Sequence, residues 1–321
     1  MSLPNELAKA IETELTTIDF SLFSKAIEEL SLRYRNSEKV LISSTIHRLA
    51  YIGVRLPATY AVIKAVLTQL KKALPNIELA SLLDLGAGPG TVAWAALNLF
   101  PAINKITLIE DDKNMLALGK KLSNNNVSLK SAEWLNLNLI KEHQFSANDL
   151  ITISYVLGEL PLVERKVLVQ KAWQATSKIL LLIEPGTPKG FSNILEAREQ
   201  LISLGANIVA PCPHQEICPM QENDWCHFSE RLPRSSLHRR AKAGYLSYED
   251  EKFSYLIVSK DVVNRPFARI IRHPLKRKGH LQLSLCTSNG LKNLTISASK
   301  DNYKLAKKSD WGDSLDLRQE E

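Results

Sequence analysis

The sequence contains few cysteines and no long apolar run, and each absence excludes a class of protein. Four cysteines among 321 residues are too few for a small domain held together by disulfides. No uninterrupted apolar stretch reaches the roughly 18 residues of a membrane-spanning helix, so we expect no membrane segment. Acids recur from Glu6 to Glu29 without an apolar signal core, which is atypical of secretory and mitochondrial leaders. We therefore expect a cytosolic protein, and we expect a monomer.

Acidic residues dominate no part of the chain, and basic residues dominate only its second half. The net charge is +7. Residues 1–160 contain 16 Lys and Arg against 16 Asp and Glu, whereas residues 161–321 contain 25 against 18. A basic half beside a neutral half indicates a polyanionic partner, of which nucleic acid is the commonest. The alternative is a lysine-rich surface that meets only solvent.

The hydrophobic pattern predicts helices first and then alternating strands and helices. Residues 5–74 show helical spacing, and Pro75 ends the last of these helices. The predicted strands begin at 81 and cover 105–110, 148–157, 178–184 and 253–260, with helices over 91–100, 114–122, 161–176 and 193–205. Apolar strands joined by helices predict a parallel sheet that helices cover on both faces.

Periodicity is lost between residues 206 and 250 and returns in a different form after 260. Three short strands are expected there, at 268–273, 280–286 and 291–297. We therefore expect a helical region (1–75), a core domain (76–260) that contains an irregular insert (206–250), and a basic β extension with a tail (261–321).

A glycine-rich loop follows the first predicted strand and precedes a helix. In the motif DLGAGPG, Asp84 precedes Gly86, Gly88 and Gly90. Glycine lets the backbone approach a ligand closely and adopt positive φ. Glu110, twenty residues after Gly90, ends the next strand, where a carboxylate can accept hydrogen bonds from ribose hydroxyls. These residues predict a nucleotide-type cofactor site.

The loop favours S-adenosylmethionine (SAM) over NAD. A dinucleotide fingerprint is G-x-G-x-x-G, but from Gly86 this loop is G-A-G-P-G-T. The acid before the first glycine is typical of class I methyltransferases, a family that about 180 residues resemble. The resemblance implies that Ser131 to Trp134, with Glu133, lie near the adenine and that Ser154 borders the methyl group. The alternative is a glycine turn that binds no cofactor.

The segment after the fourth predicted strand identifies no acceptor. Residues 154–161 are SYVLGELP, without the Asn/Asp-Pro-Pro-aromatic motif of enzymes that methylate amino groups of nucleic acids. We interpret Glu159 as an acid at a helix N-terminus, and the catalytic residue stays unassigned. The patterns predict an α/β fold with a Rossmann-like class I methyltransferase core, a helical N-terminal region, a cysteine-rich insert and a small C-terminal β extension.

The cysteines are clustered, in the order Cys212-x5-Cys218-x7-Cys226-x59-Cys286. Four thiolates suit either a tetrahedral zinc ion or a 4Fe–4S cluster. Zinc sites favour pairs two to four residues apart, and none occurs here. His214 or His227 can replace one cysteine as a ligand, so the spacing alone leaves zinc as an equal alternative. A further alternative makes Cys286 an ordinary core residue.

Several strings of sequence resemble one family. They are LPATYAVIKAVL (56–67), DLGAGPGT (84–91), LIEPGTP (182–188), and APCPHQEICPM and DWCHFSERLPRSSLHRRAK within 210–242. These strings resemble the methyltransferase-like proteins of the mitochondrial small ribosomal subunit and their bacterial relatives, over most of the chain. The resemblance implies that Cys212, Cys218, Cys226 and Cys286 hold a 4Fe–4S cluster, with zinc as the alternative. It also implies binding to the small ribosomal subunit and its RNA, in assembly or translation.

Basic side chains follow the third cysteine and continue into the extension. The predicted RNA contacts are Arg231, Arg234, Arg239, Arg240, Arg272, Lys276, Arg277 and Lys278. Three hypotheses follow: a SAM-dependent ribosomal RNA methyltransferase, a non-catalytic assembly factor that clamps ribosomal RNA, and a small-molecule methyltransferase with a zinc-bound lid. Only the first two predict salt-sensitive RNA binding.

Overall fold

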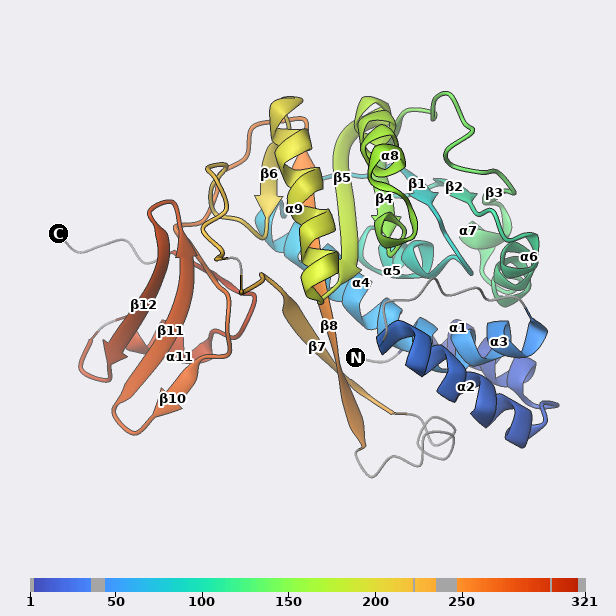
Figure 1. Ribbon diagram of the computed structural model, residues 1–321, viewed down its shortest axis with the longest axis horizontal. Helices are drawn as coiled ribbons and strands as arrows, with labels where there is room; N and C mark the ends of the chain where they lie inside the picture. The colour runs from blue at the N-terminus through green and yellow to red at the C-terminus, as the bar shows by residue number, and fades with distance from the viewer. Residues whose placement is uncertain (1–2, 36–43, 222, 235–246, 301, 317–321) are drawn as a thin grey trace.

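Helices and strands alternate along the middle of the chain, and short strands dominate its end (Figure 1). The computed structural model describes residues 3–35, 44–221, 223–234, 247–300 and 302–316. The helices are α1 (Asn5–Leu15), α2 (Phe20–Arg35), α3 (Thr45–Ala50), the π-helix η1 (Tyr51–Arg55), α4 (Leu56–Ala73), α5 (Thr91–Leu99), α6 (Lys113–Leu122), α7 (Val127–Lys130), the 3-10 helix η2 (Leu157–Glu159), α8 (Leu162–Ala175), α9 (Pro188–Ser203) and α11 (Tyr303–Lys308). The strands are β1 (Ser81–Leu85), β2 (Lys105–Ile109), β3 (Glu133–Leu135), β4 (Asn148–Ser154), β5 (Thr176–Pro185), β6 (Asn207–Ala210), β7 (Phe228–Pro233), β8 (Tyr248–Ser259), β9 (Ala268–Ile270), β10 (Leu275–Arg277), β11 (His280–Thr287), β12 (Gly290–Ser297) and β13 (Ser314–Leu315).

The larger sheet is built around β1. Its strand order is β3-β2-β1-β4-β5-β8-β6, and β7 also pairs with β8. Strands β1 to β5 are parallel, whereas β8 is antiparallel to β5, β6 and β7. The order reverses between β1 and β4, which is where open α/β sheets bind ligands outside the carboxyl ends of their strands. This topology confirms the predicted α/β fold with a Rossmann-like core.

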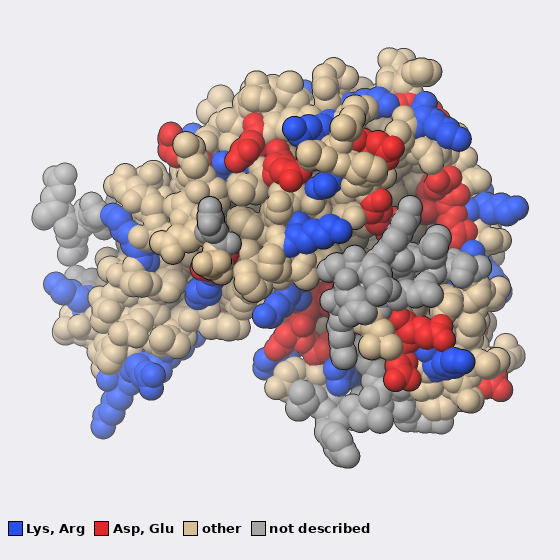
Figure 2. All heavy atoms as spheres, in the orientation of Figure 1, with Lys and Arg blue, Asp and Glu red and all other residues tan. Residues whose placement is uncertain are grey.

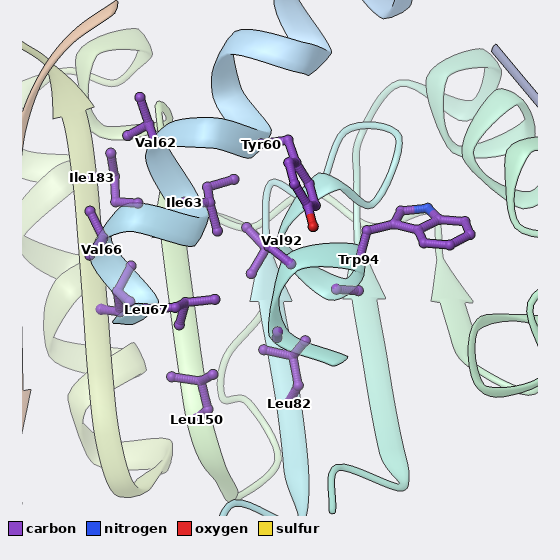
Figure 3. Close-up of a cluster of buried hydrophobic side chains, with 14 of the residues drawn as sticks. Tyr60, Val62, Ile63, Val66, Leu67, Leu82, Val92, Trp94, Leu150 and Ile183 are labelled. Atoms are coloured by element: carbon purple, nitrogen blue, oxygen red, sulfur yellow. The ribbon is translucent and has the colours of Figure 1, made fainter. Parts of the chain in front are cut away.

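Alternate residues of each central strand face opposite layers of helices. Leu82 and Leu150 belong to one buried cluster with α4 and α5, and Leu83 and Ile151 belong to another with α8 and α9. Figure 3 shows side chains of α4, including Leu67, lying over the face of the sheet that carries Leu82 and Leu150. Because both faces are covered, the central strands are largely apolar, as the sequence predicts for a parallel sheet.

The predicted irregular insert contains regular structure that periodicity did not identify. Strands β6 and β7 and the first three residues of β8 lie within residues 206–250. β7 pairs with the outer half of β8, from Phe228 opposite Phe253 to Pro233 opposite Tyr248. Most side chains of this ribbon are polar and partly exposed, so backbone pairing rather than an apolar face defines it. Periodicity detects strands only where one face is apolar.

The C-terminal part forms a second sheet with its own buried core. Its order is β10-β11-β9-β13, with β12 paired to β11. The three predicted strands correspond to β9, β11 and β12, and the structure adds β10, β13 and α11. Ile270, Leu283, Ile296 and Leu315 pack together inside this extension.

Among the described residues, one helical stretch is long and apolar enough, by length and composition alone, to span a membrane. It runs from Thr45 to Ala73 through α3, η1 and α4, and 67% of its most apolar window is buried inside the protein. A core helix of this length meets the same criteria, and α4 packs against α5 and the sheet.

Candidate functional site

The glycine loop leaves β1 and enters α5, as predicted. Gly86, Gly88 and Gly90 have φ of 76°, 55° and 81°. A Cβ at Gly86 would lie 2.3 Å from Val156 Cγ2, and one at Gly90 would lie 2.7 Å from Trp134. At Gly88 a Cβ would meet nothing within 4 Å. Two of the glycines are therefore required by packing inside the protein, and Gly88 alone of the three faces open space.

Glu110 lies beside this loop. Its Oε2 accepts a hydrogen bond from the Gly88 N–H at 2.8 Å, and its Oε1 accepts one from the Asp112 N–H at 2.9 Å. Burial raises the pKa of Glu110, although these backbone hydrogen bonds oppose the shift. Arg48 of α3 donates to both oxygens of Asp112, so the N-terminal helices are tied to the same edge of the sheet.

Asp84 is buried at the end of β1 and is only partly satisfied. Thr152 Oγ1 donates to its Oδ1 at 2.6 Å, while Oδ2 has no hydrogen-bond partner among the described residues. Burial raises the pKa of Asp84 to about 7. The hydroxyls of Thr91 and Ser154 are also buried without a partner in the described ranges. Unpaired polar atoms at the carboxyl edge of β1 and β4 fit a site that a polar ligand completes.

Glu133 does not lie where the sequence placed it. The resemblance implied that it lies near the adenine, but it begins β3, where it is exposed and its Oε2 accepts a hydrogen bond from Thr107 Oγ1 at 3.3 Å. Asn136 follows β3, and its Nδ2 donates to the carbonyl oxygens of Glu110 and Asp111, both at 2.8 Å. Asn136, rather than Glu133, therefore lies beside Glu110 at the carboxyl edge of the sheet. β3 has only three residues, so the hydrophobic pattern of the sequence was too short to show where this strand begins and ends.

The segment after β4 is held by a buried glutamate that sequence analysis missed. Glu184 ends β5; its Oε1 accepts from the Leu157 N–H at 3.0 Å and its Oε2 from Asn193 Nδ2 at 2.9 Å. Burial raises the pKa of Glu184 to about 7. A charged residue at the end of the apolar string LLLIE was the available signal. Tyr155 has a φ of 62°, which ends β4 three residues before the predicted strand end.

An ion pair lies close to Tyr155. Arg55, at the end of the π-helix, donates to both carboxylate oxygens of Glu251 on β8, at 2.9 and 3.0 Å. The Tyr155 hydroxyl is buried without a hydrogen-bond partner among the described residues. Burial, with a contribution from the Glu251 charge, raises the pKa of Tyr155. In the described residues, the Glu184 carboxylate and the Arg55–Glu251 pair are thus both engaged in contacts that support the fold.

The four cysteines converge on one cavity. β6 ends at Ala210, paired with Ile257, and β7 begins at Phe228, paired with Phe253, so the loop between them leaves a gap along β8. Ser254, Tyr255 and Leu256 fill that gap and line the cavity, which contains about 610 Å³ including its solvent-open part. The cysteines that line it are Cys212, Cys218, Cys226 and Cys286.

The thiols are partly buried and none is in a disulfide. Cys286 lies on β11 of the second sheet, so it meets cysteines of the insert rather than lying in that sheet's own core. Burial, together with the other thiols, raises the pKa of Cys226 and raises that of Cys286 to about 12. His214 Nε2 lies 3.4 Å from Cys286 Sγ. Within the described ranges, no three His, Cys, Asp or Glu side chains are placed to hold a single metal ion.

Three of the predicted RNA contacts are in ion pairs. Arg231 donates to both carboxylate oxygens of Asp250 at 2.6 and 2.8 Å, and Arg234 lies 3.4 Å from Glu249. Arg272 pairs with Asp224. Acids on the neighbouring strand or loop thus offset these positive charges. The pairing of β7 with β8 brings Arg231 and Asp250 side by side although they are far apart in sequence.

The other predicted RNA contacts that the structure describes lie at the tip of the extension, where β10 turns into β11. Lys276, Arg277 and Lys278 are exposed, and no ion pair to them occurs in the part of the chain that is described. Figure 2 shows Lys and Arg side chains at this tip, at lower left. Arg239 and Arg240 lie outside the described residues.

Comparisons with known proteins connect this architecture to a family. The sequence profile described as "Mitochondrial small ribosomal subunit Rsm22" matches residues 45–316. Rsm22-cox11 tandem protein 2, mitochondrial, of Schizosaccharomyces pombe is 29% identical over 332 residues, covering 84% of this chain and 43% of that protein. Ribosome assembly protein METTL17, mitochondrial, of Homo sapiens is 27% identical over 292 residues, covering 83% of this chain and 62% of that protein. The chain thus spans less than two thirds of these relatives.

A likeness among solved structures is more distant. A SAM-dependent methyltransferase from Leishmania major is 13% identical, with a TM-score of 0.43, over 78% of this chain and 89% of that chain. A TM-score this low adds nothing to what the strand order establishes.

The expectation of a cytosolic protein was wrong. The relatives from both organisms are mitochondrial by name, and so is the family that the profile describes. Acids recur among the first thirty residues, and this local composition does not determine the compartment.

Replacing Asp84 should change how stability depends on pH. Because the folded-state pKa is raised from 3.8 to about 7, the folded protein keeps a proton that the unfolded chain has released. The free energy of unfolding of the wild type therefore falls between about pH 4 and pH 7, by at most about 1.4 kcal/mol per pH unit from this group. Asp84→Asn should remove that decrease while Asn Oδ1 still accepts from Thr152. Urea unfolding across this pH range measures it.

The exposed Asp111 supplies the control for this measurement. Asp111→Asn changes one surface carboxylate and should retain the wild-type pH dependence. An Asp84→Asn protein that loses stability with rising pH as steeply as the wild type would contradict the role of burial.

Proposed function

The chain belongs to the family of mitochondrial small ribosomal subunit Rsm22, and on this premise we propose that it binds SAM and a 4Fe–4S cluster and acts on small-subunit ribosomal RNA during ribosome assembly. Residues 76–260 would form the SAM-binding domain, with the insert 206–250 inside it, between the helical region 1–75 and the basic extension 261–321. The observation that supports this proposal most is the convergence of four thiols, from segments far apart in sequence, on one cavity.

The donor set fits a cluster better than a zinc ion. Cys212, Cys218, Cys226 and Cys286 line the cavity, but no three ligating side chains of the described residues are close enough together for one ion. A cubane accepts thiolates that are farther apart than the ligands of a tetrahedral zinc. Thiols bind metal only as thiolates, and the high pKa of Cys286 means that a positively charged core must offset the cost of burial. When bound, the cluster would cross-link the insert to β11.

The residues at the switch point fit SAM. Asp84, Thr91 and Ser154 carry buried polar atoms that lack partners among the described residues, and Gly88 faces open space beside Glu110. Gly86 and Gly90 shape the loop, and Asn136 rather than Glu133 would border the nucleoside. A carboxylate at Asp84 would be favoured by the positive charge of the ligand, because opposite charge offsets the effect of burial.

A non-catalytic clamp is the second candidate, and the segment after β4 favours it. Glu184 is occupied in holding Leu157 and Asn193, and Arg55 and Glu251 are paired with each other. None of these groups is poised to orient an amine or remove a proton. In this function SAM and the cluster stabilise the fold while basic side chains contact phosphates.

Gly88→Ala tests the cofactor site. The new methyl group would occupy the open space and strain a residue at φ 55°, so SAM affinity should fall roughly tenfold or more. Gly205→Ala is a matched control, because Gly205 also has a positive φ and no atom within 4 Å of a Cβ, but it follows α9. Calorimetric titration with SAM measures the affinity of each variant.

Transfer of labelled methyl groups to purified small subunits then separates the two candidates. Incorporation that is present in the wild type and lost in Gly88→Ala supports an enzyme. Absence of incorporation on mature subunits and assembly intermediates supports the clamp. Equal SAM binding by the Gly88→Ala and Gly205→Ala proteins would contradict the assignment of the loop.

Anaerobic purification tests the metal centre. The wild type should be brown and contain about four irons and four sulfides per chain. Cys226→Ser should lose most of the iron, because serine is a poor ligand for this centre, whereas His214→Gln should retain it if histidine is not a ligand. A colourless protein with a single zinc ion would refute the cluster.

The exposed tip of the extension should dominate RNA binding. Joint replacement of Lys276, Arg277 and Lys278 by Gln should weaken binding to a small-subunit ribosomal RNA fragment and reduce the salt dependence, lowering the slope of log K against log salt by up to about 3. Arg231→Gln is the control, since Asp250 already pairs with Arg231, and its effect should be small. Fluorescence anisotropy over a range of salt concentrations measures both. If Arg231→Gln weakened RNA binding more than the triple replacement, the tip of the extension would not be the main RNA contact.

A further inference from the structure

Two arginines are buried at the cysteine cavity. Arg198 of α9 is 4% exposed and Arg269 of β9 is 3% exposed, and both line the cavity. Arg269 belongs to the basic second half of the chain, but its burial places it inside the protein. Neither guanidinium forms an ion pair with an Asp or Glu in the described part of the chain.

Three of their hydrogen bonds go to backbone carbonyls of the cysteine-bearing insert. The other two, both from Arg269, go to the Gly312 carbonyl and to Gln69 Oε1. Arg198 donates to the carbonyl oxygens of His214 at 3.1 Å and Glu216 at 2.7 Å. Arg269 donates from Nε to the Pro211 carbonyl at 2.7 Å and from Nη1 to the Gly312 carbonyl at 2.9 Å. These contacts fix the backbone on either side of Cys212 from two different elements.

No acidic side chain in the described part of the protein offsets the positive charge of Arg198 and Arg269. Carbonyl groups satisfy hydrogen bonds but carry no net charge, and an uncompensated buried cation costs several kcal/mol. Arg198 Nε is, in addition, a buried donor without a partner among the described residues. The charge and the unpaired donor both favour an anionic acceptor in the cavity. Thiolates are the anions that the lining residues can supply.

We propose that Arg198 and Arg269 are the counter-ions of a thiolate-ligated centre in this cavity, and that Arg198 Nε–H donates to a sulfur of that centre. The inference rests on the proposed function, because it assumes that the cysteines hold metal as thiolates. Four thiolates around a cubane core leave a net negative charge, which the two guanidiniums offset.

The proposal has a consequence for the reduction potential. Reduction adds a negative charge to the centre, and nearby positive charge stabilises the reduced state. Removal of one guanidinium should therefore lower the midpoint potential. Lysine at the same position keeps the charge but loses the forked donor, so it should preserve the potential better than a neutral residue.

The experiment compares full-length proteins purified anaerobically. The variants are Arg198→Met, Arg198→Lys, Arg269→Met and Arg269→Lys, and the control is Arg265→Gln, an exposed arginine whose side chain contacts Gln215 of the same insert. The measurements are iron and sulfide per chain, iron retention against a chelator, the midpoint potential by redox titration, and thermal unfolding by circular dichroism. The Met variants should retain iron roughly 10- to 100-fold less well than wild type, as is common for outer-shell partners, and any cluster that remains should have a lower potential.

The outcomes separate this inference from the function on which it rests. Wild-type protein without iron would refute the cluster itself. Iron-loaded wild type beside Met variants that fold, retain iron equally and have an unchanged potential would overturn only the counter-ion role. If a Met variant fails to fold, its Lys counterpart decides: a folded Lys variant whose loss of iron and fall in potential are as large as those of the folded Met variant at the other position would contradict the counter-ion role, because its charge is still present.

Discussion

Backbone pairing along β8 positions both candidate sites. Its inner half pairs with β5, which carries Glu184 at its end, and with β6, whose end leads to Cys212. Its outer half pairs with β7. Ser254, Tyr255 and Leu256 lie between the part of β8 that pairs with β6 and the part that pairs with β7, and they line the cysteine cavity. Ser254 Oγ donates to the carbonyl of Cys226. A change in the register of this strand would displace both sites together.

Helix α9 connects the same two regions from the other face of the sheet. Near its start, Asn193 donates to Glu184 and so supports the segment after β4. Further along, Arg198 holds the insert that carries the first two cysteines. The two contacts lie on one rigid element, which packs in the same buried cluster as α8. The cofactor edge and the cysteine cavity therefore share structural support, although their lining residues differ.

The distribution of charge distinguishes structural from accessible cations. Arg231 and Arg272 are in ion pairs, and Arg269 is buried against carbonyl groups. Exposed ion pairs of this kind contribute little to stability, but they remove charge from a surface that could otherwise meet phosphate. Lys276, Arg277 and Lys278, at the tip of the extension, are exposed, and none of them has an ion pair within the described ranges.

The sequence by itself determined the features that local pattern encodes. Strand and helix alternation, the glycine loop and its acid at Asp84, and the clustering of three cysteines all depend on neighbours within a few residues, so periodicity and spacing identify them. Only the tertiary structure decided that Cys286 joins the other cysteines, that Glu133 lies at the start of β3, and that Arg269 is buried. These facts depend on which strands pair and which surfaces are covered. Pairing is set by contacts between residues far apart in the chain, and no local window contains both partners.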